Sequence, residues 1–471
     1  AYRLCFHIKM YPNLAERYEL FVDAQSGEVI DSFSSICKLH HHLHTSSCNH
    51  TGAPEVQKNA VESSTSRGPK SMNGPATAEA EDLNGSMRLI NTYEFDSDYY
   101  LIDAAREMYD AGQSVLPDDP RGAIWTIDLN NTSPVNENSL YTHVNSFDNS
   151  WGETPEGVSA HYNAGKAYEY YLETFNRNAI TGTGETILSF VNVSDPDENS
   201  LGNAFWNGLG IFYGNGDSFF KSLGRALDVA GHEMSHGVIE ATANLEYRNE
   251  SGAMNEAFAD IFGAMIDRDD WTIGEEVVRQ SAFPSGALRD LSDPHNGAAT
   301  GDFQSGWQPR HVNERFTGTE NNGGVHINSG IINYAFYLFA RDVGRSIAEQ
   351  VYYRALNVYL TRSSGFNELR FAVVQSALDL YDNSVAAEAR AAFDEVGIID
   401  ESEGEFQEDL DINSGEDLLL VSDQTLETLY IFDLESGDAL FNPLSNTPMI
   451  SKPSITDDGR RIVFVGTDNH V

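Results

Sequence analysis

The sequence predicts an α+β protein whose first half is rich in strands and whose second half is helical. Between residues 86 and 216, short β-like runs such as 99–102 and 123–129 alternate with turns of Asn, Asp, Gly and Pro, and one helical pattern covers 159–175. Beyond this region apolar residues recur mainly with helical spacing. Because the two patterns meet at residues 226–245, we expect two lobes with this helix at their junction.

The net charge of the chain excludes some classes of binding partner. The chain has 72 acidic and 29 basic residues in 471, a net charge of -43. Such a charge repels nucleic acids and anionic membranes, so we predict neither as a partner. No apolar run is long enough for a membrane span. The acidity suits calcium binding or a saline, extracellular setting, and a generally soluble acidic surface explains many of these carboxylates equally well.

Changes in composition also divide the chain. Residues 51–84 contain mostly Ser, Thr, Pro, Gly, Ala and Glu without periodicity, which is typical of a linker. Residues 400–417 hold nine acidic and no basic side chains, and we interpret them as a second, acidic linker. Residues 418–471 have strand-like runs separated by Gly turns, a β-rich segment that resembles part of one propeller blade. Because the chain opens at Ala1 without a methionine, we expect a fragment of a longer precursor.

Sulfur and imidazole groups cluster near the start of the chain. A disulfide between Cys37 and Cys48 is one alternative, but with Cys5 the odd count leaves one thiol over, so we do not expect a disulfide-built fold. Five histidines lie at residues 40–50 around Cys48. Clustered histidines can bind metal, but in a polar segment a solvated linker is the favoured interpretation.

The most informative motif lies in the helix at the junction. His232 and His236 are four residues apart, with Glu233 beside the first. Residues four apart share one face of a helix, one turn apart. Two imidazoles so placed can bind one zinc ion, and a neighbouring carboxylate can take a proton from water in the open coordination position. We therefore predict a zinc site with Glu233 as its general base.

A third ligand follows along the chain. Glu256 lies twenty residues after His236, which allows a turn and the start of a second helix. Asp260, one helical turn further on, can accept the spare ring N–H of a ligand histidine and fix its tautomer. Two helices would then supply three ligands and a supporting carboxylate.

Several separate stretches resemble the thermolysin-like family of zinc metallopeptidases, in the family's order and with its spacing. These stretches are 203–208, 232–236, 252–260, 286–294 and 322–330. The resemblance runs from about residue 83 to 399. It implies a β-rich N-terminal lobe over 85–225, a helical lobe over 226–399, and the zinc site between them.

The resemblance implies a role for each matching residue of the site. The zinc ligands, followed by the base that activates the zinc-bound water, are His232, His236, Glu256 and Glu233. Tyr247 and His326 would donate to the oxyanion of the tetrahedral intermediate, where preorganised donors act most strongly. Asp260 and Asn255 would orient the ligand histidines.

The same resemblance implies a substrate groove. Asn203 and the Ala204 backbone would hold the substrate main chain, and Arg289 a substrate carbonyl. The apolar pocket for the residue just after the cleaved bond would be lined by Phe220, Leu223, Val229, Ile273, Val277 and Leu288. A bulky apolar side chain is the implied preference. Without the resemblance these six would be ordinary core residues, and Tyr247 and Arg289 surface or packing residues.

At least one structural calcium ion is also implied. The residues that match the family's main calcium site are Asp228, Asp267, Asp270 and Glu275. Carboxylates brought together in this way need a divalent cation. Thr272 and Gly286 stand where further calcium sites of the family have acids, so the resemblance supports one ion and does not extend to more.

One departure concerns the second-lobe histidine. The family usually has Asp five residues before it, whereas this chain has Asn321 before His326. An amide can orient the ring but cannot stabilise imidazolium as a charge does. We therefore expect a weaker contribution from His326.

Residues 1–50 resemble the C-terminal part of the family's propeptide, on the Val-Asp-Ala-x-x-Gly-Glu-Val pattern at 22–29. The segment 17–33 itself is predicted to form strand, turn and strand. The resemblance implies that this propeptide acts as inhibitor and folding aid, and that cleavage within the linker 51–84 releases the mature enzyme.

The leading interpretation is a secreted, extracellular zinc endopeptidase that acts on polypeptides and is made as a proenzyme. One alternative is a catalytically silent adhesion protein that keeps the fold and the metal. Another is a zinc hydrolase that trims single terminal residues. The complete set of ligands, base and oxyanion donors favours the endopeptidase.

Overall fold

The computed structural model describes two compact units, Ala1–Ile399 and Asp400–Val471. In the first unit it describes residues 5–39, 73–136, 139–196, 200–303 and 305–399. In the second it describes 418–422, 428–433, 439–445, 448, 454–455 and 462–463. The histidine cluster at 40–50, most of the linker 51–84 and the acidic linker lie outside the described residues.

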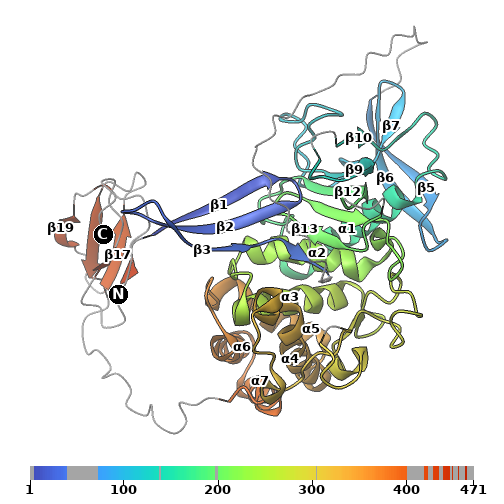
Figure 1. Ribbon diagram of the computed structural model, residues 1–471. Helices are drawn as coiled ribbons and strands as arrows, with labels where there is room; N and C mark the ends of the chain where they lie inside the picture. Colours follow the sequence, from blue (N-terminus) through green and yellow to red (C-terminus); the bar gives the residue numbers. More distant parts are fainter. Residues whose placement is uncertain are drawn as a thin grey trace. The chain divides into compact units, whose positions relative to one another are not determined.

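The first unit has a strand-rich part and a helical part with α2 between them. Its helices are α1 (Pro155–Phe175), α2 (Leu227–Glu240), α3 (Asn249–Ile266), α4 (Glu320–Val343), α5 (Arg345–Arg354), α6 (Phe366–Leu380) and α7 (Asn383–Glu395), with a π-helical turn at Ala355–Tyr359. In Figure 1 the strands from β5 to β13 lie on one side of α2, and α3 to α7 lie on the other. None of the described helices is long and apolar enough to cross a membrane. The α+β prediction with two lobes is confirmed.

The largest sheet among the described residues has seven strands, and its β13–β4 end lies at the candidate site. Its order is β10-β9-β12-β14-β13-β4, with β8 also paired to β9. The bounds are β4 (Cys37–Lys38), β8 (Ile102–Asp103), β9 (Ile124–Thr132), β10 (Thr142–His143), β12 (Ile187–Val193), β13 (Ala204–Trp206) and β14 (Ile211–Gly214). The central strands β9, β12 and β14 run parallel, whereas β13 is antiparallel to β14 and to β4. Strand β4 therefore extends this sheet with a segment from the start of the chain.

Three smaller sheets complete the first unit. A four-stranded sheet has the order β11-β7-β6-β5, and a two-stranded one pairs β15 with β16. A three-stranded antiparallel sheet is formed by β1, β2 and β3 near the N-terminus. The bounds are β1 (Cys5–Asn13), β2 (Glu16–Asp23), β3 (Val29–Ser34), β5 (Gly74–Glu81), β6 (Met87–Phe95), β7 (Asp98–Tyr100), β11 (Asn145–Ser146), β15 (Thr272–Ile273) and β16 (Arg289–Asp290).

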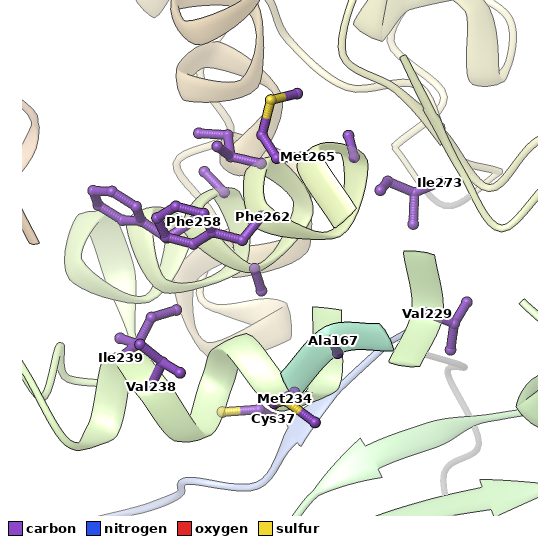
Figure 2. Close-up of a cluster of buried hydrophobic side chains, with 14 of the residues drawn as sticks. Cys37, Ala167, Val229, Met234, Val238, Ile239, Phe258, Phe262, Met265 and Ile273 are labelled. Carbon is purple, nitrogen blue, oxygen red and sulfur yellow. The ribbon is translucent and has the colours of Figure 1, made fainter. Parts of the chain in front are cut away.

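Helices α2 and α3 pack against each other at close range. Almost every residue of α2 is buried, as expected of a helix that is covered on all sides. Small residues allow the approach: a Cβ atom added to Gly231 of α2 would lie 3.2 Å from the Cα of Gly263 in α3. Figure 2 shows Val238 and Ile239 of α2 on the side of that helix that faces Phe258 of α3. This rigid pair of helices supplies the backbone of the candidate site.

Several boundaries differ from the sequence-based expectation. The helix predicted over 226–245 ends at Glu240, and α3 begins at Asn249 rather than near 255. The structure adds β1 to the predicted hairpin, and Cys37 is a free, buried thiol rather than half of a disulfide. Apolar periodicity cannot mark where a helix stops when the following turn is itself buried.

The second unit contains two small antiparallel sheets, β17-β18-β19 and β20-β21. Their strands are β17 (Leu418–Ser422), β18 (Leu429–Asp433), β19 (Ala439–Ser445), β20 (Ser454–Ile455) and β21 (Ile462–Val463). The strand-like runs predicted in residues 418–471 form strands in the described part of this unit. A meander of this kind matches the β-rich character predicted for the segment.

Candidate active site

Helix α2 presents two imidazoles to one point. The Nε2 atoms of His232 and His236 lie 3.0 Å apart, and both side chains are fully buried. The rings are perpendicular, with their centroids 4.6 Å apart. The i, i+4 spacing thus produces the convergence that the sequence predicted.

Helix α3 brings a carboxylate to the same point. Oε2 of Glu256 lies 3.6 Å from Nε2 of His232, and Oε1 of Glu256 lies 3.5 Å from Nε2 of His236. Zinc bonds of about 2.0–2.1 Å in a tetrahedron place neighbouring ligand atoms about 3.3 Å apart. The three residues therefore fit one zinc ion, and their donor set of two imidazoles and one carboxylate leaves a fourth position open.

Each ligand imidazole is held by a second side chain. Nδ1 of His232 lies 2.9 Å from Oδ1 of Asp260, and Nδ1 of His236 lies 2.8 Å from Oδ1 of Asn255. These contacts favour the tautomer in which Nδ1 carries the proton and Nε2 is free for a metal. Asp260 is itself bound by Arg289 at 2.7 Å and by the amide of Asn333 at 2.9 Å. Asn333 was not identified from the sequence.

Burial sets the protonation of the ligand group. Desolvation lowers the pKa of both ligand histidines, so the imidazoles are neutral, which is the form that binds metal. Burial raises the pKa of Glu256 to about 8. Burial by itself would raise the pKa of Asp260. The contacts with Arg289 and His232 have the larger, opposite effect, so the pKa of Asp260 lies well below its ordinary value. A divalent cation would replace the proton that Glu256 otherwise holds.

Glu233 lies on α2 next to the first ligand and is fully buried. Burial, and next the charge of Glu256, raise the pKa of Glu233 well above its ordinary value. A carboxyl group with a raised pKa can both accept and return a proton near neutral pH. This is the property that a general base beside a metal-activated water needs.

Tyr247 and His326 come from different parts of the chain to the carboxylate of Glu256. The Tyr247 hydroxyl donates a short hydrogen bond to Oε1 of Glu256 and lies 3.2 Å from Nε2 of His326. Nε2 of His326 is 3.5 Å from the same carboxylate oxygen. Two donors predicted to stabilise an oxyanion are thus brought beside the metal-ligand group.

A left-handed turn positions His326. Asn321, Asn322, Gly323 and Gly324 all have positive φ, between 51° and 83°, at the start of α4. Asn and Gly are the residues that adopt this conformation most readily. The turn brings Oδ1 of Asn321 within 3.0 Å of Nδ1 of His326, and the same oxygen accepts the backbone N–H of His326 at 2.9 Å. The amide thus takes the place that the family usually gives to a carboxylate.

The predicted pocket residues are brought together within the core. All six are at most 3 % exposed: Phe220, Leu223, Val229, Ile273, Val277 and Leu288. Ile273 pairs with Arg289 across β15 and β16, and Leu288 precedes that arginine. Arg289 therefore lies beside two of these core residues, and its side chain reaches Asp260 at 2.7 Å.

The predicted main-chain binders hold a segment of this same chain. The carbonyl oxygen of Ala204 accepts the backbone N–H of Leu39 at 3.0 Å, and Nη1 of Arg289 donates to the Leu39 carbonyl at 2.8 Å. Asn203 lies directly before this contact and its Oδ1 accepts the backbone N–H of Ala204. The position of Leu39 at this contact was not predicted from the sequence.

Acidic residues gather beside the start of α2. Carboxylate oxygens of Asp267, Glu275 and Glu276 lie within 4.8 Å of one another, and Asp228 is buried nearby. Burial, and then the charges of Glu275 and Glu276, raise the pKa of Asp228 well above its ordinary value. Asp270 is exposed, and the Thr272 hydroxyl links it to the trio, lying 2.7 Å from a carboxylate oxygen of Asp270 and 3.0 Å from one of Glu275. Glu276 is a member that sequence matching missed.

Comparisons with known proteins agree with this geometry. The family profile described as "Thermolysin metallopeptidase, catalytic domain" matches residues 77–240, and "Thermolysin metallopeptidase, alpha-helical domain" matches 243–398. Neutral protease NprE of Bacillus pumilus is 40% identical over 294 residues, which cover 62% of this chain and 93% of that protein. Fold and site define a two-lobed metallopeptidase. The chain belongs to the thermolysin family, whose members are zinc-dependent.

Longer relatives and a solved structure extend the comparison. Bacillolysin of Bacillus cereus is 35% identical over 401 residues, or 81% of this chain and 64% of that protein. Extracellular elastase of Staphylococcus epidermidis is 41% identical over 248 residues, or 52% of this chain and 47% of that protein. This chain thus spans about half to two thirds of their length. The precursor of protealysin, a metalloproteinase from Serratia proteamaculans, superposes with a TM-score of 0.52 at 28% identity over 58% of this chain and 86% of that one.

Proposed function

We propose that this protein is a zinc-dependent endopeptidase that hydrolyses peptide bonds within polypeptides. The observation that carries the proposal is the convergence of His232, His236 and Glu256, with a buried base and two donors around them. His232, His236 and Glu256 would hold a zinc ion, which would lower the pKa of the attacking water and polarise the substrate carbonyl.

Each residue of the site would have a distinct role in the hydrolysis of the peptide bond. Glu233 takes the proton of the attacking water and returns it to the nitrogen of the breaking amide bond. Tyr247 and His326 donate to the oxygen that gains negative charge in the tetrahedral intermediate. Asp260 and Asn255 keep the ligand imidazoles in the required tautomer.

The substrate groove would be set by β13 and the apolar pocket. An extended substrate would take the place of β4 at the edge of β13 through main-chain hydrogen bonds, with Ala204 and Arg289 as its partners. The six buried apolar residues of the pocket would favour a bulky apolar side chain just after the cleaved bond.

The proenzyme form is supported by the docking of residues 5–39 on the catalytic part. Arg17 donates two hydrogen bonds, at 2.5 and 2.7 Å, to the carboxylate of Glu240 at the end of α2. Arg248 forms an ion pair with Asp31 at 2.5 Å, and β4 covers the edge of β13. A segment in this place excludes other polypeptides from the groove, so its removal would activate the enzyme.

Secretion and structural calcium belong to the same proposal. The relatives include an enzyme named extracellular elastase, which supports an extracellular location.

The carboxylates of Asp267, Glu275 and Glu276, together with buried Asp228, are the hard oxygen ligands that calcium prefers. We include calcium at this cluster as a stabilising ion beside α2.

A peptidase assay with one substitution tests the activity. Glu233→Gln removes the base but keeps the shape, and we expect kcat on an internally quenched peptide to fall at least about 100-fold. Zinc content, measured by atomic absorption, should stay the same. Glu153→Gln, at an exposed position, is the matched control and should keep full activity. Equal rates for wild type and Glu233→Gln would refute the mechanism.

A further inference from the structure

Three phenylalanine rings form a row across the strands that lead to the groove. Phe190 of β12 lies opposite Phe212 of β14, and Phe212 lies opposite Phe205 of β13. The first two rings are stacked with their centroids 4.3 Å apart, and the second two with their centroids 4.8 Å apart. Such cross-strand neighbours stabilise one another. The row ends at β13, the strand beside which a substrate would bind.

This aromatic row lies on the face of the sheet that is turned away from the catalytic helix. Trp206 faces α2, because a Cβ atom added to Gly237 of that helix would lie 3.0 Å from the Trp206 ring. Successive side chains of a strand point to opposite faces, so Phe205 points away from α2. Phe205 belongs to a separate buried cluster, whose other members on the sheet are Ile127, Leu129, Phe190, Val193 and Phe212.

The N-terminal segment covers this second face at its edge. Lys38 of β4 pairs with Phe205, and Ile36 lies two residues earlier along the segment. Ile36 is 4% exposed and belongs to the same buried cluster as the three rings. Leu14, in the turn between β1 and β2, also packs against the cluster, and its carbonyl accepts a hydrogen bond from Asn207 at 2.7 Å. An apolar side chain next to β4 is therefore seated on the aromatic row.

The contacts of Leu39 give the register of a polypeptide at this edge. Its N–H donates to the Ala204 carbonyl at 3.0 Å, and its carbonyl accepts from Arg289 at 2.8 Å. These are the partners proposed above for the main chain of a substrate. The Leu39 side chain is fully buried, as expected of the residue after the cleaved bond. A substrate in this register has its third residue before the cleaved bond where Ile36 lies.

We propose that the aromatic row is a second apolar binding site for substrates, which takes the side chain of the third residue before the cleaved bond. The inference rests on the proposed endopeptidase function and deepens it. The places of Ile36 and Leu39 are three residues apart, and an odd separation puts two side chains on opposite faces of an extended chain. This agrees with the structure, where Leu39 belongs to the main core and Ile36 to the cluster on the other face.

The two sites together define a class of substrate. Main-chain pairing with β13 accepts any sequence, so selection falls to the side chains that the two faces bury. A preferred polypeptide carries two apolar side chains three residues apart in an extended segment. Folded proteins bury most such side chains, whereas unfolded polypeptides expose them. We therefore expect unfolded or loosely folded polypeptides to be the substrates.

A competition between two peptides tests the second site. Full-length, zinc-loaded protein receives a mixture of two internally quenched peptides that differ in one residue, Ile or Asn, three positions before the cleaved bond. Both side chains are uncharged, so the acidity of the enzyme does not decide the outcome. We expect the Ile peptide to be cleaved at least about tenfold faster, because its side chain leaves water. Competing substrates report the ratio of their kcat/KM values, which does not depend on how many molecules have a free groove.

A matched pair of peptides is the control for position. The same change from Ile to Asn is made at the fifth residue before the cleaved bond, and mass spectrometry confirms which bond is cut. The two control peptides should be cleaved at similar rates, because that position lies beyond the place of Ile36. A preference of equal size at both positions would show general affinity for apolar peptides and would overturn the inference.

Substitutions of Phe205 assign the preference to the aromatic row. Phe205→Ser removes the ring at the edge and should bring the ratio for the two peptides close to one. Phe205→Leu keeps an apolar side chain and should keep the preference. Misfolded molecules cleave neither peptide, so they do not change the ratio. Phe371→Ser makes the same chemical change at a side chain that is 64% exposed on α6 and should behave as wild type.

The outcomes separate this inference from the proposed function. If wild type cleaves the Ile and Asn peptides equally well, the second site is wrong and the endopeptidase function stands. If it cleaves none of the peptides, both proposals are wrong. An undiminished preference in Phe205→Ser would also overturn the inference, because another surface would then select the side chain.

Discussion

Each of the three imidazoles of the candidate site is oriented by a second side chain. Asp260 contacts His232, Asn255 contacts His236, and an asparagine five residues upstream contacts His326. Two of the three partners are amides. An amide fixes a ring through a hydrogen bond without adding charge, so orientation and basicity are set separately in this site.

Asn321→Asp tests that separation. A carboxylate beside Nδ1 would stabilise the imidazolium form of His326, so the protonated donor should persist to higher pH. We expect the alkaline limb of the pH profile of kcat/KM to move up by about one pH unit. An unmoved limb would contradict the role given to His326. Asn313→Asp, on an exposed 3-10 turn, serves as the control.

At the scale of elements, the geometry of the site depends on how closely α2 approaches α3. A Cβ atom at Gly263 would lie 2.8 Å from the backbone oxygen of Asp228, which cannot move without moving α2. The ligand atoms on these two helices are only 3.5–3.6 Å apart, close to the spacing expected around one zinc ion. A shift of a few tenths of an ångström between the helices therefore reaches the metal directly.

Gly263→Ala should separate the two helices. We expect the free energy of unfolding to fall by about 1–3 kcal/mol, as is typical of overpacking, and zinc affinity to fall with it. Denaturant unfolding and zinc titration with a competing chelator measure the two effects. Gly152→Ala has open space around the added methyl group and should change neither. Loss of stability without loss of zinc affinity would show that the helix spacing does not set the site.

The acidic cluster predicts a pH-dependent need for calcium. Burial, and then neighbouring charges led by Glu275, raise the pKa of Asp267 to about 6 and that of Glu276 to about 7. A raised folded-state pKa means that stability present below about pH 4 is lost as the pH rises through 6 to 7. Without calcium the thermal midpoint should fall by at least about 2 °C from pH 5 to pH 8, and millimolar calcium should restore it.

Chelation gives the corresponding control. Zinc is replenished after a calcium-selective chelator is added, so that only the acidic cluster is emptied. Glu276→Gln removes one raised carboxyl and should flatten the dependence of the midpoint on pH. A midpoint that is indifferent to calcium at pH 8 would show that the cluster is not a calcium site.

The elements of the site differ in how far they could be predicted. His232, His236 and Glu256 lie on two regular helices, so spacing along the sequence specifies where their side chains point. Glu276 lies in an irregular segment, where spacing along the sequence does not fix the direction of a side chain, and this member of the acidic cluster was not predicted. The left-handed turn before His326 was also unexpected, although its Asn-Asn-Gly-Gly sequence carries the signal.

At the scale of the molecule, the N-terminal segment and the groove form one assembly. The fold class and its two lobes were predictable, because runs of strands and then helices follow one another along the chain. The docking of residues 5–39 was not, since contacts such as Arg17 with Glu240 join positions more than two hundred residues apart. Neither periodicity nor local motifs carry information about such pairings.

Arg17→Ala tests the strength of this docking. The guanidinium is almost fully buried against Glu240, and loss of one partner of a buried ion pair weakens an interface by about 2–5 kcal/mol. We expect the initial peptidase rate of the uncut full-length chain to rise at least about tenfold. Arg121→Ala, whose side chain is 59% exposed, should leave that rate unchanged. Equal latency in both variants would mean that this ion pair does not hold the segment.

The central claim is that three ligands on two helices make a zinc-dependent endopeptidase. The most direct measurement maps by mass spectrometry the products of an unfolded protein substrate before zinc removal, after it, and after zinc is returned. The account predicts internal fragments that begin with bulky apolar residues, that vanish without zinc and that return with it. Products trimmed only from the ends, or internal cleavage that is indifferent to zinc, would contradict it.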